Sequence, residues 1–245
     1  MVVGTSEPAS RNADVCGAMP SETADCRPIR WARPVAGDDG CCQASDVPSF
    51  VTPVIAPGSL SRVHQPVLTA GSIRLRPWAD ADAPALVSAY QEPTIQRWHA
   101  RSLTPDEADD WVASAHAAWM AETAVSWAVD LDDQLAGRMT LKLDNSDGSA
   151  AAAYWTRTVA RRRGVASRAL RLATGWAFSA GMHRVELEHS TLNPVSCLVA
   201  DRAGFDAEGT RRGSALHADG WHDMHVHATI DAMSTLGAPQ AMACT

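Results

Sequence analysis

The stretch Arg161-Arg162-Arg163-Gly164-Val165-Ala166 decides the fold, because it joins a strand-like run at 151–155 to a long helical pattern. The first amides of a helix have no carbonyl partners within it, and together with the helix dipole they form an anion site. Flanking arginines strengthen such a site, Gly164 lets the backbone approach closely, and Ala166 adds almost no bulk. The stretch therefore predicts a strand, a tight turn and a helix that together bind a pyrophosphate.

Other interpretations of this basic turn are weaker. It lacks the Gly-Lys-Ser/Thr ending of Walker A and the three glycines of the dinucleotide fingerprint, which argues against nucleotide hydrolysis and NAD binding. A plain solvated charge run is also less favourable, since cations at a helix start oppose the helix dipole. We therefore expect a different ligand that carries a diphosphate.

Taken with the residues that follow, the basic turn makes the sequence resemble the GNAT acetyltransferases. Their signature, Gln/Arg-x-x-Gly-x-Gly/Ala, is matched by Arg161, Gly164 and Ala166. The match continues through four stretches: His183-Arg184-Val185-Glu186-Leu187-Glu188, Asn193-Pro194-Val195-Ser196, Arg202-Ala203-Gly204-Phe205 and Gly220-Trp221-His222-Asp223-Met224. These are similar to the RimJ/RimL branch, whose known members acetylate protein N termini, and the resemblance covers roughly residues 66–230.

The chain is expected to form one folded domain between two tails. Residues 1–65 are rich in Pro, Ser, Ala, Gly and Asp without a helix or strand pattern, which predicts a disordered N-terminal tail. Folding onto a partner, or translation from an upstream start codon, are alternative explanations for this segment. The acetyl-CoA-binding N-acetyltransferase domain is expected at 66–231, followed by a flexible C-terminal tail at 232–245.

The pattern within the domain predicts a strand, two helices, three strands, a helix, a strand, a helix and two strands. Thr104-Pro105-Asp106-Glu107 is typical of a helix start with a capping box, and Asp132-Asp133-Gln134 of a hairpin turn. The fold class is α/β (α+β), with a GNAT-like central mixed, mostly antiparallel sheet and helices on both faces. The resemblance implies that the two parallel central strands, ending near Trp155 and His189, splay apart to admit acetyl-pantetheine.

Acetyl-CoA is the cosubstrate that the resemblance implies, and residues 154–156 and 188–193 should face its acetyl group. Asn193 precedes Pro194 and suits a helix N-cap, while in the family it hydrogen-bonds the pantetheine. Ser196 matches a serine that the branch uses near the thioester, although serine also suits this helical position structurally. The residues expected to bind the cosubstrate are Trp155, Thr156, Arg161, Arg162, Arg163, Gly164, Val165, Ala166, Asn193 and Ser196.

Two residues that assist catalysis elsewhere in the family are missing. The tyrosine that often protonates the leaving thiolate is Ala200 here, as is usual in the branch, and the glutamate that some branch members use as base is Ala215. Strand alternation places Glu188 on the face opposite Leu187, and a partly buried glutamate can act as a general base. Glu188 and Ser196 are therefore the expected catalytic residues. Five histidines are alternative bases: His189, His217, His222, His225 and His227. On strand alternation His225 and His227 share a face with Asp223, where a hydrogen-bonded structural array is the other explanation.

The acceptor is the least determined part of this hypothesis. Trp98, His99 and Arg101 lie between the first two predicted helices, a region that covers the acceptor groove in the family, and with Glu92 they are expected to contact the acceptor. The primary prediction is N-acetylation of an α-amino group, such as a protein or peptide N terminus. Acetylation of a small amine, including an antibiotic or metabolite, and a catalytically silent acyl-CoA-binding module are the alternatives.

Charge and hydrophobicity argue against two classes of partner, nucleic acids and membranes. The net charge of −7 argues against a nucleic-acid-binding protein, and no apolar run reaches the length of a membrane span, so we expect a cytoplasmic protein without nucleic-acid or membrane partners. A homodimer is one option for the oligomeric state. Four cysteines of the N-terminal tail lack paired C-x-x-C spacing, so no metal is expected there. They are Cys16, Cys26, Cys41 and Cys42.

Overall fold

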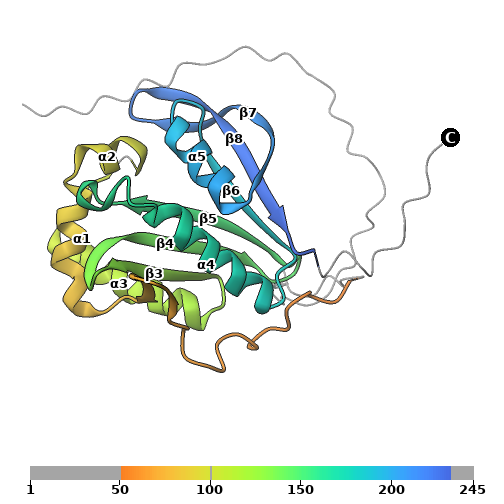
Figure 1. Ribbon diagram of the computed structural model, residues 1–245. Coiled ribbons are helices and arrows are strands. Elements are labelled where there is room, and N and C mark those ends of the chain that lie inside the picture. Colours follow the sequence, from red (N-terminus) through yellow and green to blue (C-terminus); the bar gives the residue numbers. More distant parts are fainter. Residues whose placement is uncertain (1–50, 100, 233–245) are drawn as a thin grey trace, which may run out of the picture. The chain divides into compact units, whose positions relative to one another are not determined.

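The computed structural model describes residues 51–99 and 101–232, which form an eight-stranded mixed sheet with helices on both faces (Figure 1). The strands are ordered β1-β2-β3-β4-β5-β6-β8-β7, and every neighbouring pair is antiparallel except β5 and β6. Their bounds are β1 Leu68–Ala70, β2 Ile73–Pro77, β3 Ala124–Leu131, β4 Gln134–Asp144, β5 Ser149–Thr156, β6 Arg184–Ser190, β7 Asp206–His217 and β8 Gly220–Ile230. The predicted fold class is confirmed.

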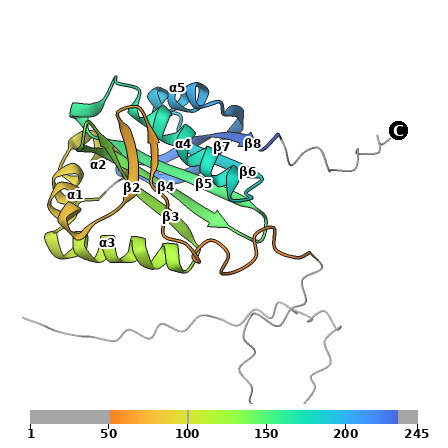
Figure 2. The same ribbon diagram turned by 60° about the horizontal axis from the view of Figure 1, so that its bottom comes forward.

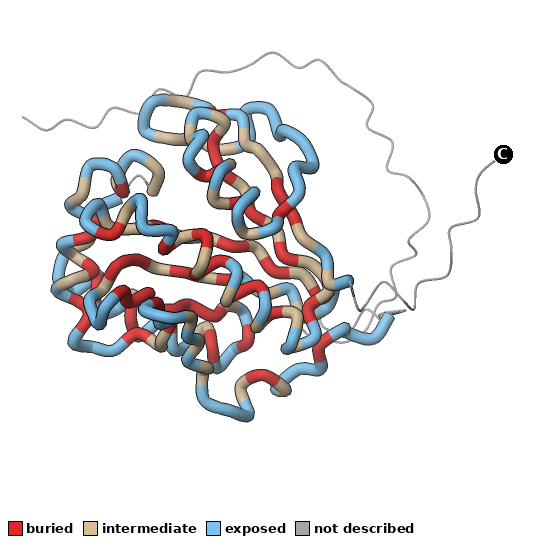
Figure 3. The backbone as a smooth tube through the Cα atoms, viewed as in Figure 1, coloured by how far each residue is buried: buried red, intermediate tan, exposed pale blue. Residues whose placement is uncertain are grey.

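Helices cover the two faces of the sheet unequally (Figure 2). On one face, α1 (Ala83–Tyr90), α2 (Pro93–His99) and α3 (Pro105–Met120) bury Leu86, Ile95 and Val112 against Trp155 of β5. On the other, α4 (Val165–Ser179) and α5 (Pro194–Ala203) pack on Trp127 and the apolar residues of β2–β6. The buried backbone is concentrated in the central strands, whereas the edge strand β7 is exposed along most of its length (Figure 3). Two short 3-10 helices, η1 (Asp80–Asp82) and η2 (Thr158–Ala160), complete the elements.

Several local predictions are confirmed. Thr104 caps α3, with its hydroxyl accepting from the amide of Glu107 and the Glu107 carboxylate accepting from the amide of Thr104. Asp132 and Asp133 both have positive φ, 52° and 59°, which matches the twist of a tight hairpin. Two elements lie outside the prediction: the short strand β1, and the helix α2 in the segment between the first two expected helices.

The N-terminal boundary of the domain differs from the prediction, because residues 51–65 pack on the domain. Ile55 and Leu60 are buried in the main core, and the carboxylate of Glu122 accepts hydrogen bonds from the amides of Gly58, Leu60 and Ser61 at 2.6–2.7 Å. This segment has no periodic apolar pattern, since two apolar anchors and one buried carboxylate hold it. Residues 1–50 and 233–245, which make up the rest of the predicted tails, lie outside the described residues.

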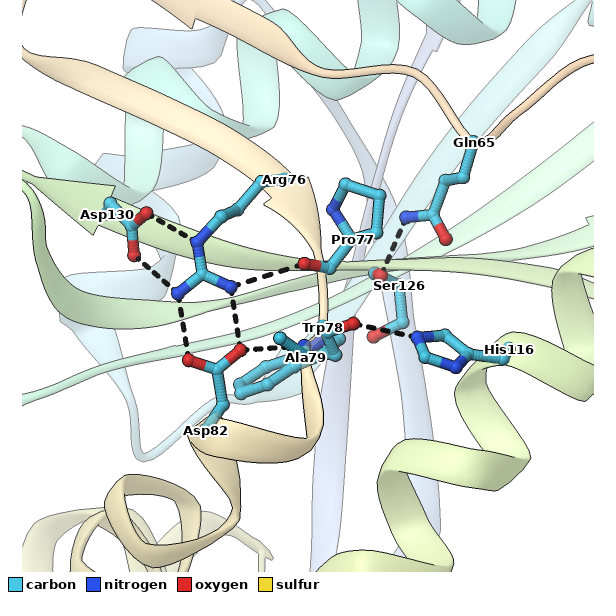
Figure 4. Close-up of polar contacts among 9 residues, drawn as sticks. All are labelled: Gln65, Arg76, Pro77, Trp78, Ala79, Asp82, His116, Ser126 and Asp130. Atoms are coloured by element: carbon cyan, nitrogen blue, oxygen red, sulfur yellow. Dashed lines mark hydrogen bonds and ion pairs between the residues drawn. The ribbon is translucent and has the colours of Figure 1, made fainter.

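A charged bridge fixes the end of β2 against the first helices (Figure 4). The guanidinium of Arg76 donates to both oxygens of Asp82, at 2.6 and 2.8 Å, and to Asp130 of β3 at 2.7 Å. Burial alone would raise the pKa of Asp82, but the hydrogen bonds from Arg76 and from the amide of Ala79 outweigh it and lower that pKa. The bridge therefore holds the β2–α1 turn in place at neutral pH.

The two parallel strands separate partway along their length. Pairing of β5 with β6 runs from Ser149↔Arg184 to Ala152↔Leu187 and then stops. Beyond this point β5 stays paired with β4 as far as Thr156, and β6 stays paired with β8 as far as Ser190. The predicted splay of the central strands is confirmed, and it leaves an opening between Tyr154 and His189.

Candidate active site

The basic turn has the backbone shape of an anion-binding loop. Arg162 and Gly164 both have positive φ, 61° and 70°, so the chain bends sharply just before α4 begins. The first hydrogen bond of α4 runs from the amide of Arg168 to the carbonyl of Gly164, at 3.2 Å. The amides of residues 165–167 therefore lack partners within the helix and can bind an anion together with the helix dipole.

The three arginines of the turn point to different places. Arg161 and Arg162 line a cavity of about 690 Å³ that extends from the turn to α2. The Nε of Arg161 donates to the carbonyl of Thr156 at 3.1 Å, which holds the guanidinium beside the end of β5. Arg163 instead forms an exposed ion pair with Asp132 at 2.7 Å and does not line this cavity. Of the predicted cationic contacts, Arg163 is thus directed away, because the β3–β4 hairpin offers it a carboxylate.

The same cavity gathers most of the residues that the sequence indicated. Thr156 and Ala166 line it beside the turn, while Val165 and Trp155 contribute to its wall although their side chains are largely buried in the two cores. The predicted residues on its lining are Trp98, His99, Trp155, Thr156, Arg161, Arg162, Gly164, Val165, Ala166, Asn193 and Ser196. One continuous space thus connects the basic turn with the splayed strands.

Asn193 stands at the N-cap of α5, but its side chain makes no capping hydrogen bond. The turn is held instead by the backbone, with the amide of Ser196 donating to the carbonyl of Asn193 at 3.0 Å. The hydroxyl of Ser190 also accepts from the amide of Leu192 and contacts Nδ1 of His222 at 2.8 Å. The Asn193 amide group is therefore available to a ligand in the cavity.

Tyr154 is a site residue that the sequence analysis placed at the acetyl group without assigning it a role. Its hydroxyl donates to the hydroxyl of Ser196 at 3.0 Å, and both residues line the cavity. Burial raises the pKa of Tyr154 to about 12, and the hydrogen bond to Ser196 only partly opposes this shift. Tyr154 is therefore a protonated donor at neutral pH, supplied by β5 where the family's usual tyrosine position on α5 is Ala200.

A second hollow of about 130 Å³ lies in the opening between β5 and β6 and shares Trp98, His99, Tyr154, Asn193 and Ser196 with the cavity. Glu188 lines it and forms an ion pair with Arg211 of β7. His217 also lines it, and the Nδ1 of this ring is buried without a hydrogen-bond partner in the described part of the chain. The hollow therefore brings a carboxylate and an imidazole nitrogen close to the Tyr154–Ser196 pair.

The four predicted acceptor contacts separate into two groups. Trp98 and His99 of α2 line both spaces, and Trp98 contacts the ring of His217 with centroids 6.0 Å apart. Glu92 instead accepts from Arg157 at 3.1 Å and from the amide and hydroxyl of Thr158 at 2.8 Å. Both of its carboxylate oxygens therefore bind the segment that follows β5, and Glu92 lines neither space. Arg101 is exposed and lines neither space.

Arg138 of β4 lies close to His99, the last residue of α2. Burial lowers the pKa of His99 to about 4, and the neighbouring charge of Arg138 adds to this effect. Arg138 donates to the hydroxyl of Tyr90 at 3.1 Å and lies over the ring of Trp111, 5.7 Å from its centroid. The sequence did not single out Arg138, because an arginine within an alternating strand normally faces solvent.

A family model described as an acetyltransferase (GNAT) domain matches residues 72–206, more than half of the chain. The chain belongs to the GNAT acetyltransferase family. It is thus an acetyltransferase that uses acetyl-CoA as its cosubstrate. No curated protein matches the chain.

Solved GNAT structures share the fold at low sequence identity. The acetyltransferase from Salmonella typhimurium that modifies the N-terminal serine of a 50S ribosomal subunit protein superposes with a TM-score of 0.63 at 19% identity, over 68% of this chain and 99% of that chain. RimL in complex with coenzyme A superposes with a TM-score of 0.63 at 20% identity, over 67% of this chain and 98% of that chain. RimJ of Mycobacterium smegmatis in complex with CoA-disulfide superposes with a TM-score of 0.61 at 20% identity, over 69% of this chain and 87% of that chain. The structural neighbours of this GNAT domain thus include the RimJ/RimL branch.

The helices of this domain give no sign of a membrane span. Among residues 51–99 and 101–232, no helix is long and apolar enough to cross a bilayer.

Proposed function

We propose that this GNAT domain transfers the acetyl group of acetyl-CoA to an α-amino group, such as the N terminus of a protein or peptide. The observation that carries the proposal is the continuity of the two spaces. The cavity that starts at the basic turn reaches Tyr154 and Ser196, and the hollow between β5 and β6 continues from the same residues. A thioester that enters from the turn can thus meet an amine that enters beside α2.

The residues of the turn are assigned to the diphosphate of the cosubstrate. The amides of residues 165–167 and the guanidinium groups of Arg161 and Arg162 supply its hydrogen bonds and positive charge. Asn193, whose side chain is not used for capping, is assigned to the pantetheine amides. The edges of β5 and β6 beyond the last paired residues supply main-chain groups to the same arm.

The reaction forms a bond between the amine nitrogen and the acetyl carbon and breaks the bond between that carbon and the thioester sulfur. The amine must lose a proton, and Glu188 and His217, which line the hollow, are assigned as its acceptors. The departing thiolate gains one from Ser196, whose hydroxyl is free to donate because Tyr154 occupies one of its lone pairs. Positioning of the amine beside the thioester supplies the main rate enhancement.

The titratable groups of the hollow favour an α-amine over a lysine side chain. At neutral pH a lysine amine carries a handicap of about 3 kcal/mol, because its pKa lies near ~10.4 rather than ~8. Glu188 is ion-paired with Arg211, and imidazoles are weak bases, so the groups at hand suit an acceptor that deprotonates easily.

The proposal is tested by incubating the purified chain with acetyl-CoA and three acceptor panels, while free coenzyme A thiol is followed. The panels are peptides with a free N terminus and no lysine, N-terminally blocked peptides with one lysine, and small amines. We expect turnover with the first panel, and mass spectrometry should place the acetyl group on the terminal nitrogen. Turnover confined to blocked peptides or to small amines would overturn the acceptor assignment.

Acetylation of lysate proteins followed by mass spectrometry of their N-terminal peptides then identifies the natural acceptor class. The Ser196→Ala variant serves as the matched control, because it keeps the fold and the cosubstrate site but loses the proposed proton donor. A set of N termini acetylated equally by both proteins would reflect chemical acetylation and not catalysis.

A further inference from the structure

Three histidines and one cysteine meet where α5 crosses β6 and β8. His225 and His227 are alternate residues of β8 and therefore share a face, and His189 of β6 lies directly opposite His225. Cys197 approaches from α5, with its Sγ 3.3 Å from Nδ1 of His225. One ligand atom from each of the four residues lies within 4.8 Å of every other. We refer to these four residues as the imidazole–thiol cluster.

The spacing of the cluster matches a small tetrahedral site. Tetrahedral zinc with bonds of about 2.0–2.1 Å to nitrogen and about 2.3 Å to sulfur places its ligand atoms about 3.3–3.6 Å apart. In this cluster Nε2 of His189 and Nε2 of His227 are 3.2 Å apart, close to that spacing. The other distances between ligand atoms are at most 4.8 Å. Side-chain rotations that move these atoms by about 1 Å or less would bring all four to tetrahedral spacing.

A hydrogen bond to the backbone also orients one ring of the cluster for metal binding. Nδ1 of His189 lies 2.9 Å from the carbonyl of Ser190, to which it can only donate, and this leaves the Nε2 lone pair directed at the centre of the cluster. His189 and His227 are both buried, so few water molecules compete for their ring nitrogens.

We propose that the imidazole–thiol cluster binds one divalent transition-metal ion, zinc in the cell, in a closed structural site. Three imidazoles and a thiolate are a ligand set of the type that zinc prefers, and four protein ligands fill a tetrahedral shell without an open position for substrate. Binding converts the thiol of Cys197 to a thiolate and releases its proton to solvent. None of the four ligands is a cysteine of the N-terminal tail, for which no metal was expected.

The position of the site indicates what the ion does. Backbone pairing between β5 and β6 ends at Ala152↔Leu187, whereas pairing between β6 and β8 continues to Ser190↔Met224. A metal that joins β6, β8 and α5 would fix the helix that presents Ser196, the residue directly before Cys197. The ion would thus hold the acetyl-transfer site in shape, since one of its ligands, His189, also lines the hollow between β5 and β6.

A hydrogen-bonded histidine array is the competing explanation. Nε2 of His227 can donate to Nε2 of His189, and the rings of these residues are stacked with centroids 5.1 Å apart. Such an array needs no ion, and it predicts that Cys197 can be replaced by serine without consequence for metal content or for chelator sensitivity.

The test uses the full chain, freed of any affinity tag and kept reduced, and measures metal content by mass spectrometry of the elements. We expect about one zinc ion per chain. After chelation, Co²⁺ should bind with the same stoichiometry and give the strong visible bands of a tetrahedral site together with a thiolate-to-cobalt charge-transfer band. The Cys197→Ser variant should lose that charge-transfer band, and a chelator should lower the melting temperature of the parent protein but not of this variant.

Two controls separate this site from other ligands. A variant with serine at the four cysteines of the N-terminal tail should keep the metal, and so should His64→Ala, which removes an exposed imidazole outside the cluster. Metal-free parent protein that shows no tetrahedral Co²⁺ spectrum would overturn the proposal, and this readout does not depend on any variant folding. Metal lost only with the tail cysteines would overturn it as well.

Discussion

The hydroxyl of Tyr154 donates to the hydroxyl of Ser196 over 3.0 Å, linking β5 to α5 across the gap where β5 and β6 separate. The bond orients both groups. Because Tyr154 occupies a lone pair of Ser196, the serine proton is free to point into the cavity. Because burial raises the pKa of Tyr154 to about 12, the phenol stays protonated at neutral pH and keeps this hydrogen bond. Two residues from distant parts of the chain thus form one proton-donating unit.

Removing either hydroxyl should slow turnover more than it weakens cosubstrate binding. Tyr154→Phe and Ser196→Ala are each expected to lower kcat by about 10- to 100-fold, since the first removes the hydrogen bond that orients the serine and the second removes the proton donor itself. The affinity for acetyl-CoA should stay within about threefold. Steady-state kinetics and calorimetry measure the two quantities, with Ser114→Ala on the exposed side of α3 as control. Unchanged kcat in the double variant would exclude the pair from catalysis.

Arginines of the basic turn should differ in their effect on cosubstrate affinity. Arg161→Ala is expected to weaken acetyl-CoA binding by at least about tenfold, because it removes a charge-assisted contact to the diphosphate. Arg163→Ala should change the affinity less than about twofold, because this side chain pairs with Asp132 at the surface. Calorimetric titrations at one salt concentration compare the two variants, and equal losses would contradict the different directions of these side chains.

Stability should fall as the pH drops from about 6.5 toward 4, and His99 should account for part of the loss. Its pKa is about 4 in the folded chain and about 6.5 for an ordinary histidine, so the unfolded chain binds more protons in this window. The lowered pKa of His99 therefore reduces the free energy of unfolding by up to about 3 kcal/mol below pH 4, and it has no effect on that free energy above pH 7.

The check compares the parent protein with His99→Gln by denaturant unfolding at pH 7.5 and pH 5. The variant should lose less stability between the two pH values, whatever its stability at pH 7.5. If both proteins lose the same amount, the burial of His99 does not produce the shift.

Replacing Gly137 should destabilise the fold, because the backbone of the neighbouring strand β5 approaches it closely. A Cβ at this position would lie 2.5 Å from the carbonyl oxygen of Trp155, a backbone atom that cannot move without disturbing β5. Gly137→Ala is expected to destabilise the fold by about 2 kcal/mol or more. Gly175→Ala in α4, where nothing lies within 4 Å, should stabilise it by about 0.5–1 kcal/mol. Thermal and denaturant unfolding measure both, and a neutral Gly137→Ala would show that β5 can shift.

Glu122 should be one of the residues most sensitive to substitution outside the active site. Its carboxylate accepts from the amides of Gly58, Leu60 and Ser61, so Glu122→Ala leaves three amides without their partner. We expect a loss of about 2–4 kcal/mol and faster proteolysis within residues 51–65. Glu208→Ala, which removes an exposed carboxylate from the edge strand, should change the stability far less, because exposed ion pairs are screened by solvent. Equal resistance to protease in both variants would argue against the anchoring role.

The splayed strands were implied by the resemblance to the GNAT family. Sequence patterns alone determined the order of most strands and helices, and the basic turn that carries the resemblance. These features depend on local periodicity, on caps such as Thr104, and on a glycine that tolerates positive φ, all of which can be read from neighbouring residues. The pattern did not predict that residues 51–65 are ordered, since their anchors are a few contacts to residues far along the chain.

Only the tertiary structure decided which side chains meet. Arg163 turns to Asp132, Glu92 braces Thr158, and Tyr154 reaches Ser196 because strands and helices remote in sequence pack side by side. The imidazole–thiol cluster likewise needs β6, β8 and α5 together, since only the sheet register places His189 opposite His225 and only helix packing brings in Cys197. Periodicity assigns a residue to a face, whereas the contacts across that face come from long-range packing.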